Sequence, residues 1–471
     1  MPVLVGVGTC SDDVEAVELM ARATARAGDD AGAPSLLREA GSIAVPRGTW
    51  SYTDPARVVA ERVGATRATT VLVDLGIPQQ TPVNEAMTAI RDGELDVAVV
   101  VGAEAKAHAA RTPGATDLDQ HGATPDVHQQ PQGEIVSRAE INAKLWTPVQ
   151  QYALMESALR AAEDVTPAQN RRDVAELWAR FNKVARGNPD AAFPAPMTAD
   201  DLATFGPGNR PLAFPYGKWH ASQWTVDQGA ALLLCAAEVA ERHGVARDRW
   251  VFPRVGLDSS FALPLSTRRA MHRWPAMQVL GQAASARIGR PLASCEHAEV
   301  YSCFPVAVRV QQRELGLPLD GTPTITGGMT FAGGPFDNFV LQATAAMAQT
   351  LRERGGLGLV TTVSGLLTKP GLAVWAAEDD GEPALVADLA RDAAAATERV
   401  DVLDAYDGDA IVAACTVTYD GEEPRELVAI LDAPAGERVI AKSDDAALAA
   451  RATEQELVGT TLGVAGNGLR A

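Results

Sequence analysis

The sequence predicts an α/β fold of two similar halves, followed by a small β-rich domain. Three observations predict it. Short apolar runs alternate with amphipathic stretches from the first residue, a Gly-Pro turn followed by a helix and a strand occurs twice, and the composition changes after Trp375. Such alternation is typical of mostly parallel sheets whose strands are joined by helices.

The first half begins with strand and helix patterns in regular alternation. Ser11, Asp12 or Asp13 is the expected N-cap of the first helix. A turn at 76–78 precedes a later helix that ends at Arg91. The predicted strands are 3–7, 42–45, 70–74 and 96–102, and the other predicted helices are 14–27 and 55–63.

Between residues 106 and 210 this alternation stops. The segment is rich in Pro, Gln, Asn and Asp and contains two helical patterns, 149–162 and 171–186. Because Leu177, Trp178 and Phe181 need burial, we expect an insertion that covers the sheet rather than a linker. The alternation then resumes with a strand at 226–235, a helix at 238–243 and a strand at 249–256.

The second half repeats the turn, helix and strand of the first. Gly334-Pro335 is followed by a helix at 338–354 and a strand at 357–363. An acidic, turn-forming boundary at 378–383 then introduces a tail with short strands expected at 411–419, 426–431 and 438–443. We expect this tail to form a small barrel that packs on the core or on a partner.

Charge and composition exclude several classes of protein. The 41 Lys and Arg against 60 Asp and Glu give a net charge of -19, and no Lys/Arg run exceeds a pair, so a nucleic-acid binder is not expected. No apolar stretch is long enough to span a membrane, and the first residues do not resemble a signal peptide. Five scattered cysteines and seven histidines show no metal-ligand spacing, so we expect reduced thiols, no metal and a cytoplasmic location.

Four motifs, in order over residues 1–375, resemble those of thiolases. They are GIPQQTPVNEAMTAIRDGELDVAVVVGAEA from Gly76, WTVDQGAALLLCAAEVAERHG from Trp224, YSCFP from Tyr301 and TGGMTFAGGP from Thr326. The inserted RFNKVARGNPDAAF and GNRPLAFPYGKWH, together with the β-rich tail, resemble most the thiolase-like protein type 1 branch, which is acetyl-CoA acetyltransferase-like and has an additional C-terminal domain.

This resemblance implies the five-layered thiolase fold, in which duplicated α/β halves enclose the catalytic pocket. The expected N-terminal half is 1–105 plus 211–250, and the inserted cap or loop segment is 106–210. The C-terminal half is 251–377, and the small β-barrel-like domain is 378–471.

The catalytic residues that the resemblance calls for are missing. Thiolases carry a nucleophilic cysteine at a helix N-terminus, where the helix dipole and free amides lower the thiol pKa. Gly76 stands at that position, and Gly334 stands where the activating histidine belongs. The segment that should hold the second cysteine, 361–365, has none, and Tyr301 occupies the Asn/His position of the third motif.

The resemblance also implies which residues still form a thioester pocket. Gly76 is expected to begin a helix whose amides hold an oxyanion or a thioester carbonyl. Cys303 is the candidate substitute nucleophile and Tyr301 the candidate weak acid, the alternatives being a small buried thiol and a packed ring. His220 is a pocket candidate or a surface histidine. The expected substrate-binding residues are Gly76, Tyr301, Gly327, Gly328, Gly333, Gly334 and Gly365.

Three functions follow. The first is a thiolase-like protein of acyl-CoA or lipid metabolism that lacks the Cys/His/Cys set and binds an acyl-CoA-type thioester. The second is an acyltransferase of the acetyl-CoA C-acyltransferase type that works with non-standard residues, ordinary thiolase activity being absent. The third is a non-catalytic interaction module that recruits a protein partner through its C-terminal domain. Coenzyme A or acyl-CoA is the expected ligand, weakly held because the protein is acidic, and the chain is a monomer or a homodimer.

Overall fold

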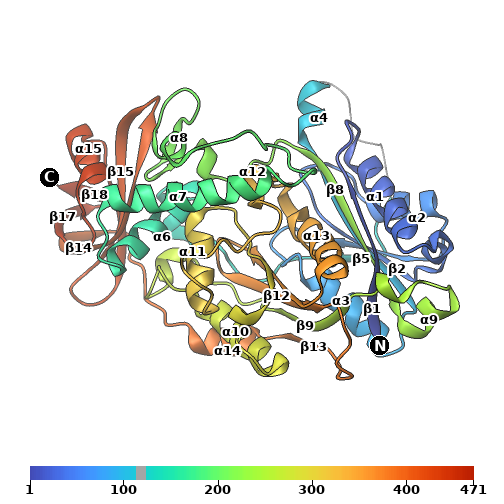
Figure 1. The fold of residues 1–471 in the computed structure, drawn as a ribbon. Helices are drawn as coiled ribbons and strands as arrows, with labels where there is room; N and C mark the ends of the chain where they lie inside the picture. The colour runs from blue at the N-terminus through green and yellow to red at the C-terminus, as the bar shows by residue number, and fades with distance from the viewer. Residues whose placement is uncertain (113–122, 471) are drawn as a thin grey trace.

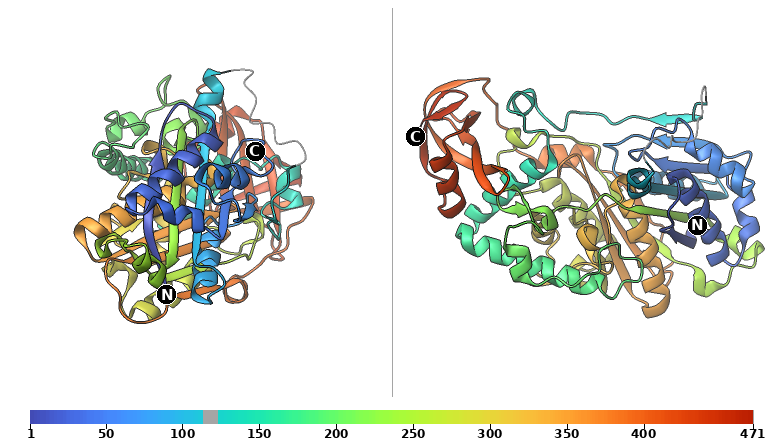
Figure 2. Two further views of the ribbon diagram at one scale, coloured as in Figure 1. Left: turned by 90° about the vertical axis from the view of Figure 1, so that its right-hand side faces the viewer. Right: turned by 90° about the horizontal axis from the view of Figure 1, so that it is seen from above.

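The computed structural model describes residues 1–112 and 123–470 of the chain. It is a layered α/β core with a β-rich domain attached (Figure 1). Figure 2 shows that this domain and the first half lie at opposite ends of the molecule. Part of the predicted insertion, with His121, lies outside the described residues. Within the described ranges, no helix is long and apolar enough to cross a membrane.

The first core sheet is mixed rather than mostly parallel. Its strand order is β1-β8-β4-β2-β3-β5. Strands β4, β2, β3 and β5 run parallel, whereas β8 pairs antiparallel with both β1 and β4. The strands are β1 (Pro2–Cys10), β2 (Ser42–Pro46), β3 (Thr69–Val73), β4 (Val97–Ala105), β5 (Val127–Gln129) and β8 (Asp227–Ala236).

The second core sheet repeats the pairing of the first. Its order is β10-β11-β12-β9-β13, so β9-β12-β11-β10 has the same sequence of antiparallel, antiparallel and parallel pairs as β1-β8-β4-β2. This shared order confirms the predicted duplication. The strands are β9 (Phe252–Asp258), β10 (His297–Glu299), β11 (Leu357–Ser364), β12 (Lys369–Ala376) and β13 (Leu385–Asp388).

Helices cover and separate the two sheets. Helices α1 (Ala16–Asp30) and α2 (Pro55–Val63) pack on the first sheet, and α10 (Pro275–Ile288) packs on the second. Helices α3 (Thr81–Arg91) and α13 (Phe339–Arg354) each contact strands of both sheets and therefore lie between them. In the described part of the chain this succession of helices and sheets confirms the five-layered fold.

Helix ends show where sequence signals succeed and fail. Helix α2 has the predicted bounds, because the Asp54 carboxylate accepts the Arg57 N–H and Gly64, with φ 81°, ends the helix. The predicted cap of α1 is wrong: its N-cap is Glu15, whose side chain makes no capping bond. Asp12 instead pairs with Arg22, through their side chains.

The two main helices of the insertion pack on core helices and on the tail rather than over a sheet. They are α6 (Pro148–Ala162) and α7 (Pro167–Ala185), and Leu177, Trp178 and Phe181 of α7 are buried. Helix α6 contacts both α11 (Pro305–Glu314) of the core and strand β14 of the tail. The shorter helices are α4 (Lys106–Arg111), α5 (Arg138–Asn142), α8 (Ala199–Ala203), α9 (Ala237–Arg242) and α12 (Gly328–Phe331).

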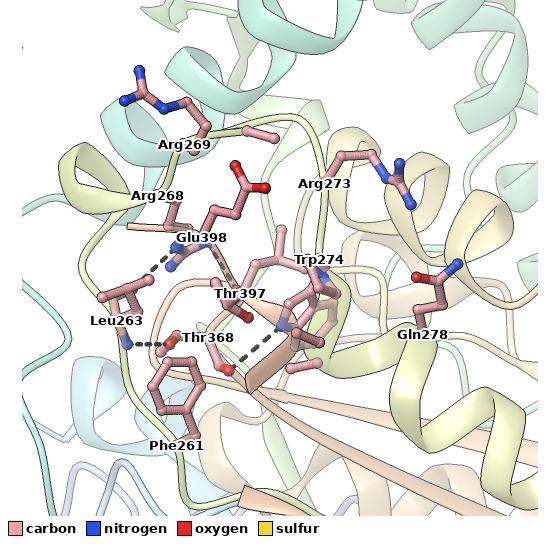
Figure 3. Close-up of a pocket in the computed structure, with 15 residues that line it drawn as sticks. Phe261, Leu263, Arg268, Arg269, Arg273, Trp274, Gln278, Thr368, Thr397 and Glu398 are labelled. Carbon is pink, nitrogen blue, oxygen red and sulfur yellow. Dashed lines mark hydrogen bonds between the residues drawn. The ribbon is translucent and has the colours of Figure 1, made fainter. Parts of the chain in front are cut away.

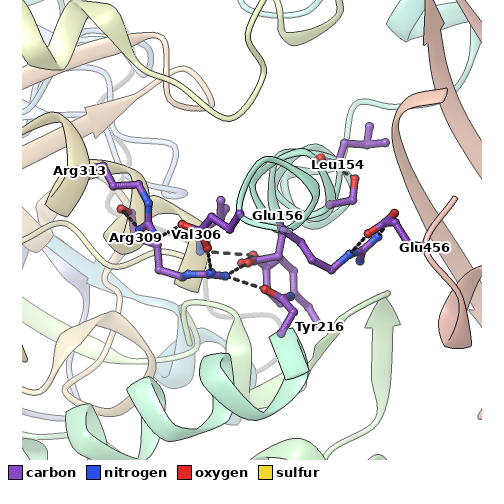
Figure 4. A network of polar contacts seen from close by, with 11 residues as sticks. Leu154, Glu156, Tyr216, Val306, Arg309, Arg313 and Glu456 are labelled. Atoms are coloured by element: carbon purple, nitrogen blue, oxygen red, sulfur yellow. Dashed lines mark hydrogen bonds and ion pairs between the residues drawn. The ribbon is translucent and has the colours of Figure 1, made fainter. Parts of the chain in front are cut away.

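A buried polar network fixes α6 between core and tail (Figure 4). Glu156 of α6 pairs with Arg309 of α11 and accepts the Tyr216 hydroxyl at 2.5 Å. On the other side, Arg160 binds both carboxylate oxygens of Glu456 at 2.6 and 2.8 Å. The tail therefore docks within its own chain.

The tail forms a closed barrel. Strand β14 pairs with both β15 and β17, while β16 and β18 close the remaining gap. Two short strands, β6 (Pro211–Ala213) and β7 (Tyr216–Gly217), extend this sheet beyond β14. The sequence had assigned both of them to the N-terminal half. The strands are β14 (Tyr406–Asp420), β15 (Glu423–Asp432), β16 (Arg438–Ser443), β17 (Thr461–Gly466) and β18 (Gly468–Arg470), and the barrel helix is α15 (Ala446–Glu454).

The core continues beyond the predicted boundary at residue 377. Strand β13 pairs parallel with β9, and α14 (Ala390–Ala396) packs on α10. The acidic turn returns to the core because Asp380 pairs with Arg254 and Arg287 at 2.8 and 3.0 Å.

Candidate functional site

The N-terminal ends of the two central helices meet where the halves join. Gln79 precedes α3, and its Oε1 accepts the backbone N–H of Val340, in the first turn of α13, at 2.8 Å. A first-turn amide has no partner within its own helix. At this junction a side chain of one half therefore satisfies a helix N-terminus of the other.

Gly76 does not begin α3, so that prediction is wrong. Helix α3 begins at Thr81 with Gln80 as its N-cap. Gly76 has φ 99° and belongs to the preceding turn, where its carbonyl accepts the Lys369 ammonium at 3.0 Å. A Cβ at Gly76 would lie 3.1 Å from Pro131 Cβ.

Residues 129–135, here called the covering segment, lie over two of the predicted glycines. Pro131 faces Gly76, and a Cβ at Gly365 would lie 2.7 Å from Ile135 Cγ2. Lys369 of β12, which is buried, ties the covering segment down by donating also to the Gln132 carbonyl at 2.6 Å.

The other predicted glycines are closely packed by the chain itself. A Cβ at Gly327 would overlap Ala185 of α7. A Cβ at Gly334 would overlap the Ser222 hydroxyl, and one at Gly333 would overlap the Gln228 amide. These glycines therefore permit close packing of the insertion and of residues 222–228. A Cβ at Gly328 would likewise lie 2.6 Å from Phe181 Cδ1 of α7.

Tyr301 and Cys303 are buried in the interior. Tyr301 packs edge-on against Phe339, and burial together with Cys303 and Asp337 raises its pKa far above the ordinary value. Burial raises the pKa of Cys303 to about 12, so its thiol is scarcely ionised at neutral pH. The geometry favours the packed ring and the buried thiol over catalytic roles.

Gln79 and Asp337 are the junction residues that the sequence reasoning missed. Burial raises the pKa of Asp337 to about 8, and the Gln79 amide beside it partly opposes that shift. Each residue lies three positions after the glycine of a repeated turn, Gly76 or Gly334, so the duplication was the signal that could have found them.

Several buried polar atoms at this junction have no hydrogen-bond partner among the described residues. Most buried polar groups in proteins are hydrogen-bonded, so these atoms leave donor and acceptor capacity between the halves. They are Gln80 Oε1, Asn84 Nδ2, Asp337 Oδ2, Asn338 Oδ1 and Thr362 Oγ1.

A cavity of about 820 Å³, here called the α3 cavity, runs along α3 beside Gly76. Asp258, at the end of β9, lines it and accepts the Thr81 hydroxyl at 2.6 Å. Burial raises the pKa of Asp258 to about 6. Lys369 is the cation among the lining residues, and the acidic ones are Glu85, Glu94, Asp258 and Asp388.

A second cavity of about 520 Å³, here called the α13 cavity, runs along α13. Its charged lining residues are Asp190, Glu353 and Arg354. Hydroxyl and amide side chains make up about half of the wall: Thr9, Ser11, Asn188, Gln228, Thr324, Thr326, Gln342, Gln349 and Thr350.

His220 is 2% exposed rather than a surface residue, and its Nδ1 accepts the Gly217 N–H at 3.1 Å. Burial lowers its pKa to about 3, so the ring is neutral at neutral pH. Among residues 1–112 and 123–470, no group of three His, Cys, Asp or Glu side chains could hold a metal ion.

Comparison with known proteins supports the fold. Neither protein-family models nor curated proteins give a match. A monomeric SCP2-thiolase-like protein type 1 from Mycobacterium smegmatis is 26% identical with a TM-score of 0.84, over 100% of this chain and 98% of that one. The acetyl-CoA acetyltransferase of Syntrophomonas wolfei is 16% identical with a TM-score of 0.59, over 80% of this chain and 99% of that one.

The human mitochondrial 3-ketoacyl-CoA thiolase is also 16% identical, with a TM-score of 0.57, over 80% of this chain and 98% of that one. These two enzymes leave part of this chain unmatched, whereas the mycobacterial protein matches its whole length. The duplicated halves, the layered core and the barrel at its end are thus found together in one solved relative. The chain is a thiolase-like protein of the thiolase superfamily.

Proposed function

We propose that this chain is a thiolase-like protein of lipid metabolism that binds an acyl thioester without covalent chemistry. One observation carries the proposal: glycines stand at the places of the nucleophile and the base, and Pro131 and Ser222 pack against them. Acyl transfer through an enzyme thioester needs a thiolate with a base in reach. The residues that line the α3 cavity in the described structure include neither cysteine nor histidine.

The state of Cys303 supports the same conclusion. A nucleophilic cysteine usually has a lowered pKa, whereas burial raises that of Cys303 to about 12. Its side chain is only 8% exposed, so a substrate carbonyl has little access to the sulfur.

The α3 cavity is the proposed place of the thioester. Its volume of about 820 Å³ falls in the usual range for small-molecule sites. An ammonium group has three donors, and Lys369 uses two of them on Gly76 and Gln132, which leaves one for a thioester carbonyl. Glu85, Asp258 and Asp388 face the same space, so we expect the acyl part rather than the coenzyme A phosphates to supply most of the affinity.

Calorimetry with coenzyme A and with medium- and long-chain acyl-CoA tests this proposal. We expect acyl-CoA to bind more tightly than coenzyme A, and Lys369→Met to weaken acyl-CoA binding by about tenfold, the loss of one charged hydrogen bond. Lys442→Met is the matched control, because Lys442 pairs with Glu426 in the barrel. Absence of acyl-CoA binding would remove the ligand part of the proposal.

Product analysis tests the chemical part. We expect neither formation nor cleavage of acetoacetyl-CoA by the unmodified chain. If either reaction occurs and is lost in Cys303→Ala, covalent chemistry through that thiol replaces the proposal.

A further inference from the structure

A third cavity, of about 330 Å³, lies where the C-terminal half meets the tail (Figure 3). Its walls come from the loop between β9 and α10, the turn between β11 and β12, and the connector after α14. We call it the arginine pocket, after Arg268, Arg269 and Arg273, which line it. In a chain of net charge -19, three arginines around one small cavity are a local reversal of sign.

Arg268 carries a buried positive charge that forms no ion pair with any described residue. The residue is 5% exposed, and its guanidinium donates to the carbonyls of Leu263, Leu367 and Leu366 at 3.0, 2.9 and 2.9 Å. Burial lowers its pKa to about 10, so the group stays charged at neutral pH. Carbonyl dipoles compensate a buried cation less completely than an anion does, so an anion in the pocket would lower the free energy of this arrangement.

The acidic group whose charge reaches Arg268 is already engaged elsewhere. Glu140 accepts the backbone N–H groups of Ser137 and Ser266, at 2.8 and 2.6 Å. Among the described residues no carboxylate forms an ion pair with Arg268. The anion that would best match Arg268 therefore has to come from outside the chain.

The mouth of the pocket holds one further available cation. Arg273 is neutralised, because its Nε and Nη2 bind the two carboxylate oxygens of Glu314 at 2.7 and 2.9 Å. Arg269 is exposed, and in the described structure its guanidinium donates only to the Gly436 carbonyl, at 3.3 Å. In the view of Figure 3 the carboxylate of Glu398 lies between these two arginines, where the anionic group of a ligand would compete with it.

The rest of the wall is apolar and aromatic. Trp274 is buried, with its indole N–H directed to the Thr368 carbonyl at 3.4 Å, and Phe261, Leu263 and Leu367 complete the surface. A volume of about 330 Å³ is at the lower end of the range for ligand sites. The pocket thus suits a compact apolar body that carries one anionic group.

We propose that the arginine pocket binds a small organic anion, with its carboxylate or phosphate-ester group at Arg268 and Arg269 and its apolar body against Trp274 and Phe261. This site is separate from the α3 cavity, and the proposal does not rest on thioester binding there.

Tail contacts connect this pocket to the barrel. Arg438 of β16 is 2% exposed and donates to the carbonyls of Arg269 and Ser266 at 2.8 and 3.3 Å. The connector adds a hydrogen bond from Val400 N–H to the Thr267 carbonyl at 2.9 Å. Because the tail holds the loop that carries the arginines, a bound anion is expected to stabilise tail docking as well.

Calorimetry on the full chain tests the proposal with three sets of probes. Octanoate and benzoate represent free carboxylates, coenzyme A and inorganic phosphate represent phosphate groups, and benzamide is the neutral match of benzoate. We expect Arg269→Gln to weaken anion binding by about tenfold, and Glu398→Gln, which removes the competing carboxylate, to strengthen it by about threefold. Arg242→Gln is the matched control and should leave binding unchanged. Arg242 is exposed, and its Nη2 lies 3.8 Å from Asp96 Oδ2.

Binding that depends on Arg269 supports the proposal, and the arm that binds identifies the source: free acids for a carboxylate ligand, coenzyme A for a phosphate ester. The proposal is overturned if no anion binds the unmodified chain or Glu398→Gln, if Arg269→Gln binds as tightly as the unmodified chain, or if benzamide binds as tightly as benzoate. None of these variants removes Arg268, whose three carbonyl contacts support the loop.

Discussion

The α3 and α13 cavities occupy corresponding places in the two halves but differ in chemistry. Each lies along the central helix of one half and reaches the end of the first strand of the other, β9 for the α3 cavity and β1 for the α13 cavity. At that strand end the α3 cavity has Asp258, whereas the α13 cavity has Thr9. The two halves thus share a strand order, whereas the residues at the strand ends and in the loops determine the charge of each cavity.

The two turns that precede the central helices differ in the same way. At Gly334 the Ser222 hydroxyl occupies the position of a Cβ, whereas at Gly76 the nearest atom, Pro131 Cβ, lies 3.1 Å away. The α13 side is therefore more tightly closed than the α3 side. Substitutions at corresponding places should reveal this difference as unequal losses of stability.

The largest effect is expected for Gly334→His, which restores the side chain that the family resemblance places there. The imidazole would overlap Ser222 and approach the Met329 carbonyl, so we expect the free energy of unfolding to fall by about 3 kcal/mol. Urea denaturation measures it. Gly206→Ala is the control, because no atom lies within 4 Å of a Cβ there. An unchanged unfolding midpoint for Gly334→His would show that the α13 side is not closed.

A smaller effect, and one of opposite sign, is expected for Asp258→Asn in the α3 cavity: the free energy of unfolding should rise. The pKa of Asp258 is raised from 3.8 to about 6 in the folded chain, so the folded state holds the proton more tightly and stability falls as pH rises through this interval. Above pH 6 the carboxylate is ionised in both states and the full cost remains. One pKa unit corresponds to about 1.4 kcal/mol, so the shift corresponds to about 3 kcal/mol. We expect Asp258→Asn to be more stable by about 2 kcal/mol at pH 8, because the amide NH2 of the variant needs a new hydrogen-bond partner.

Below about pH 4 this advantage should vanish, because Asp258 is then protonated whether the chain is folded or not. Thermal unfolding of both chains from pH 4 to 8 tests it. A gain of equal size at every pH would contradict ionisation as the cause.

Gly76→Cys should have a moderate effect and yield no activity. The residue would adopt φ 99° and press on Pro131, which we expect to destabilise the chain by about 1.5 kcal/mol. The new thiol would lack a histidine at position 334, so we expect no cleavage of a 3-ketoacyl-CoA. Detectable cleavage would mean that the covering segment leaves this position open to substrate.

The smallest effect is expected at the edge of the first sheet, where β5 covers β3. The Asp126 carboxylate, just before β5, accepts the Thr70 N–H at 2.9 Å and the Arg57 guanidinium at 2.7 Å. Asp126→Ala should lower stability by less than about 1 kcal/mol, because the site is half exposed, and should free an edge strand. Light scattering should show more self-association for the variant than for the unmodified chain. A variant that associates no more than the unmodified chain at high concentration would show that β5 does not protect the edge.

Local signals in the sequence predicted most of the elements. Pro55–Val63 and Arg438–Ser443 have the predicted bounds because a cap, a proline or a charged turn marks each end. Pairing over long sequence distances was not predictable in this way. Strand β13 joins β9 across the predicted boundary, and β6 joins β14 across some two hundred residues, through contacts that no local pattern encodes.

The candidate site was predicted only in part. The glycines were located by motif, but what faces each of them depends on the insertion, whose path over the core has no periodic signal. Asp337 and Arg268 were missed because their burial, and not their residue type, makes them unusual. Binding of a protein partner through the C-terminal domain stays a prediction.

The covering segment also acts as a tethered competitor. Because β5 and α5 hold it at both ends, Pro131 faces Gly76 at an effective concentration on the order of millimolar. A free ligand that needs contact with Gly76 must displace Pro131. The apparent dissociation constant of this ligand therefore equals the intrinsic constant divided by the fraction of chains in which the segment is released. Loosening of the segment with Lys369 left in place, whose third donor is the proposed contact to the ligand, would raise the apparent affinity at Gly76 without adding any contact to the ligand.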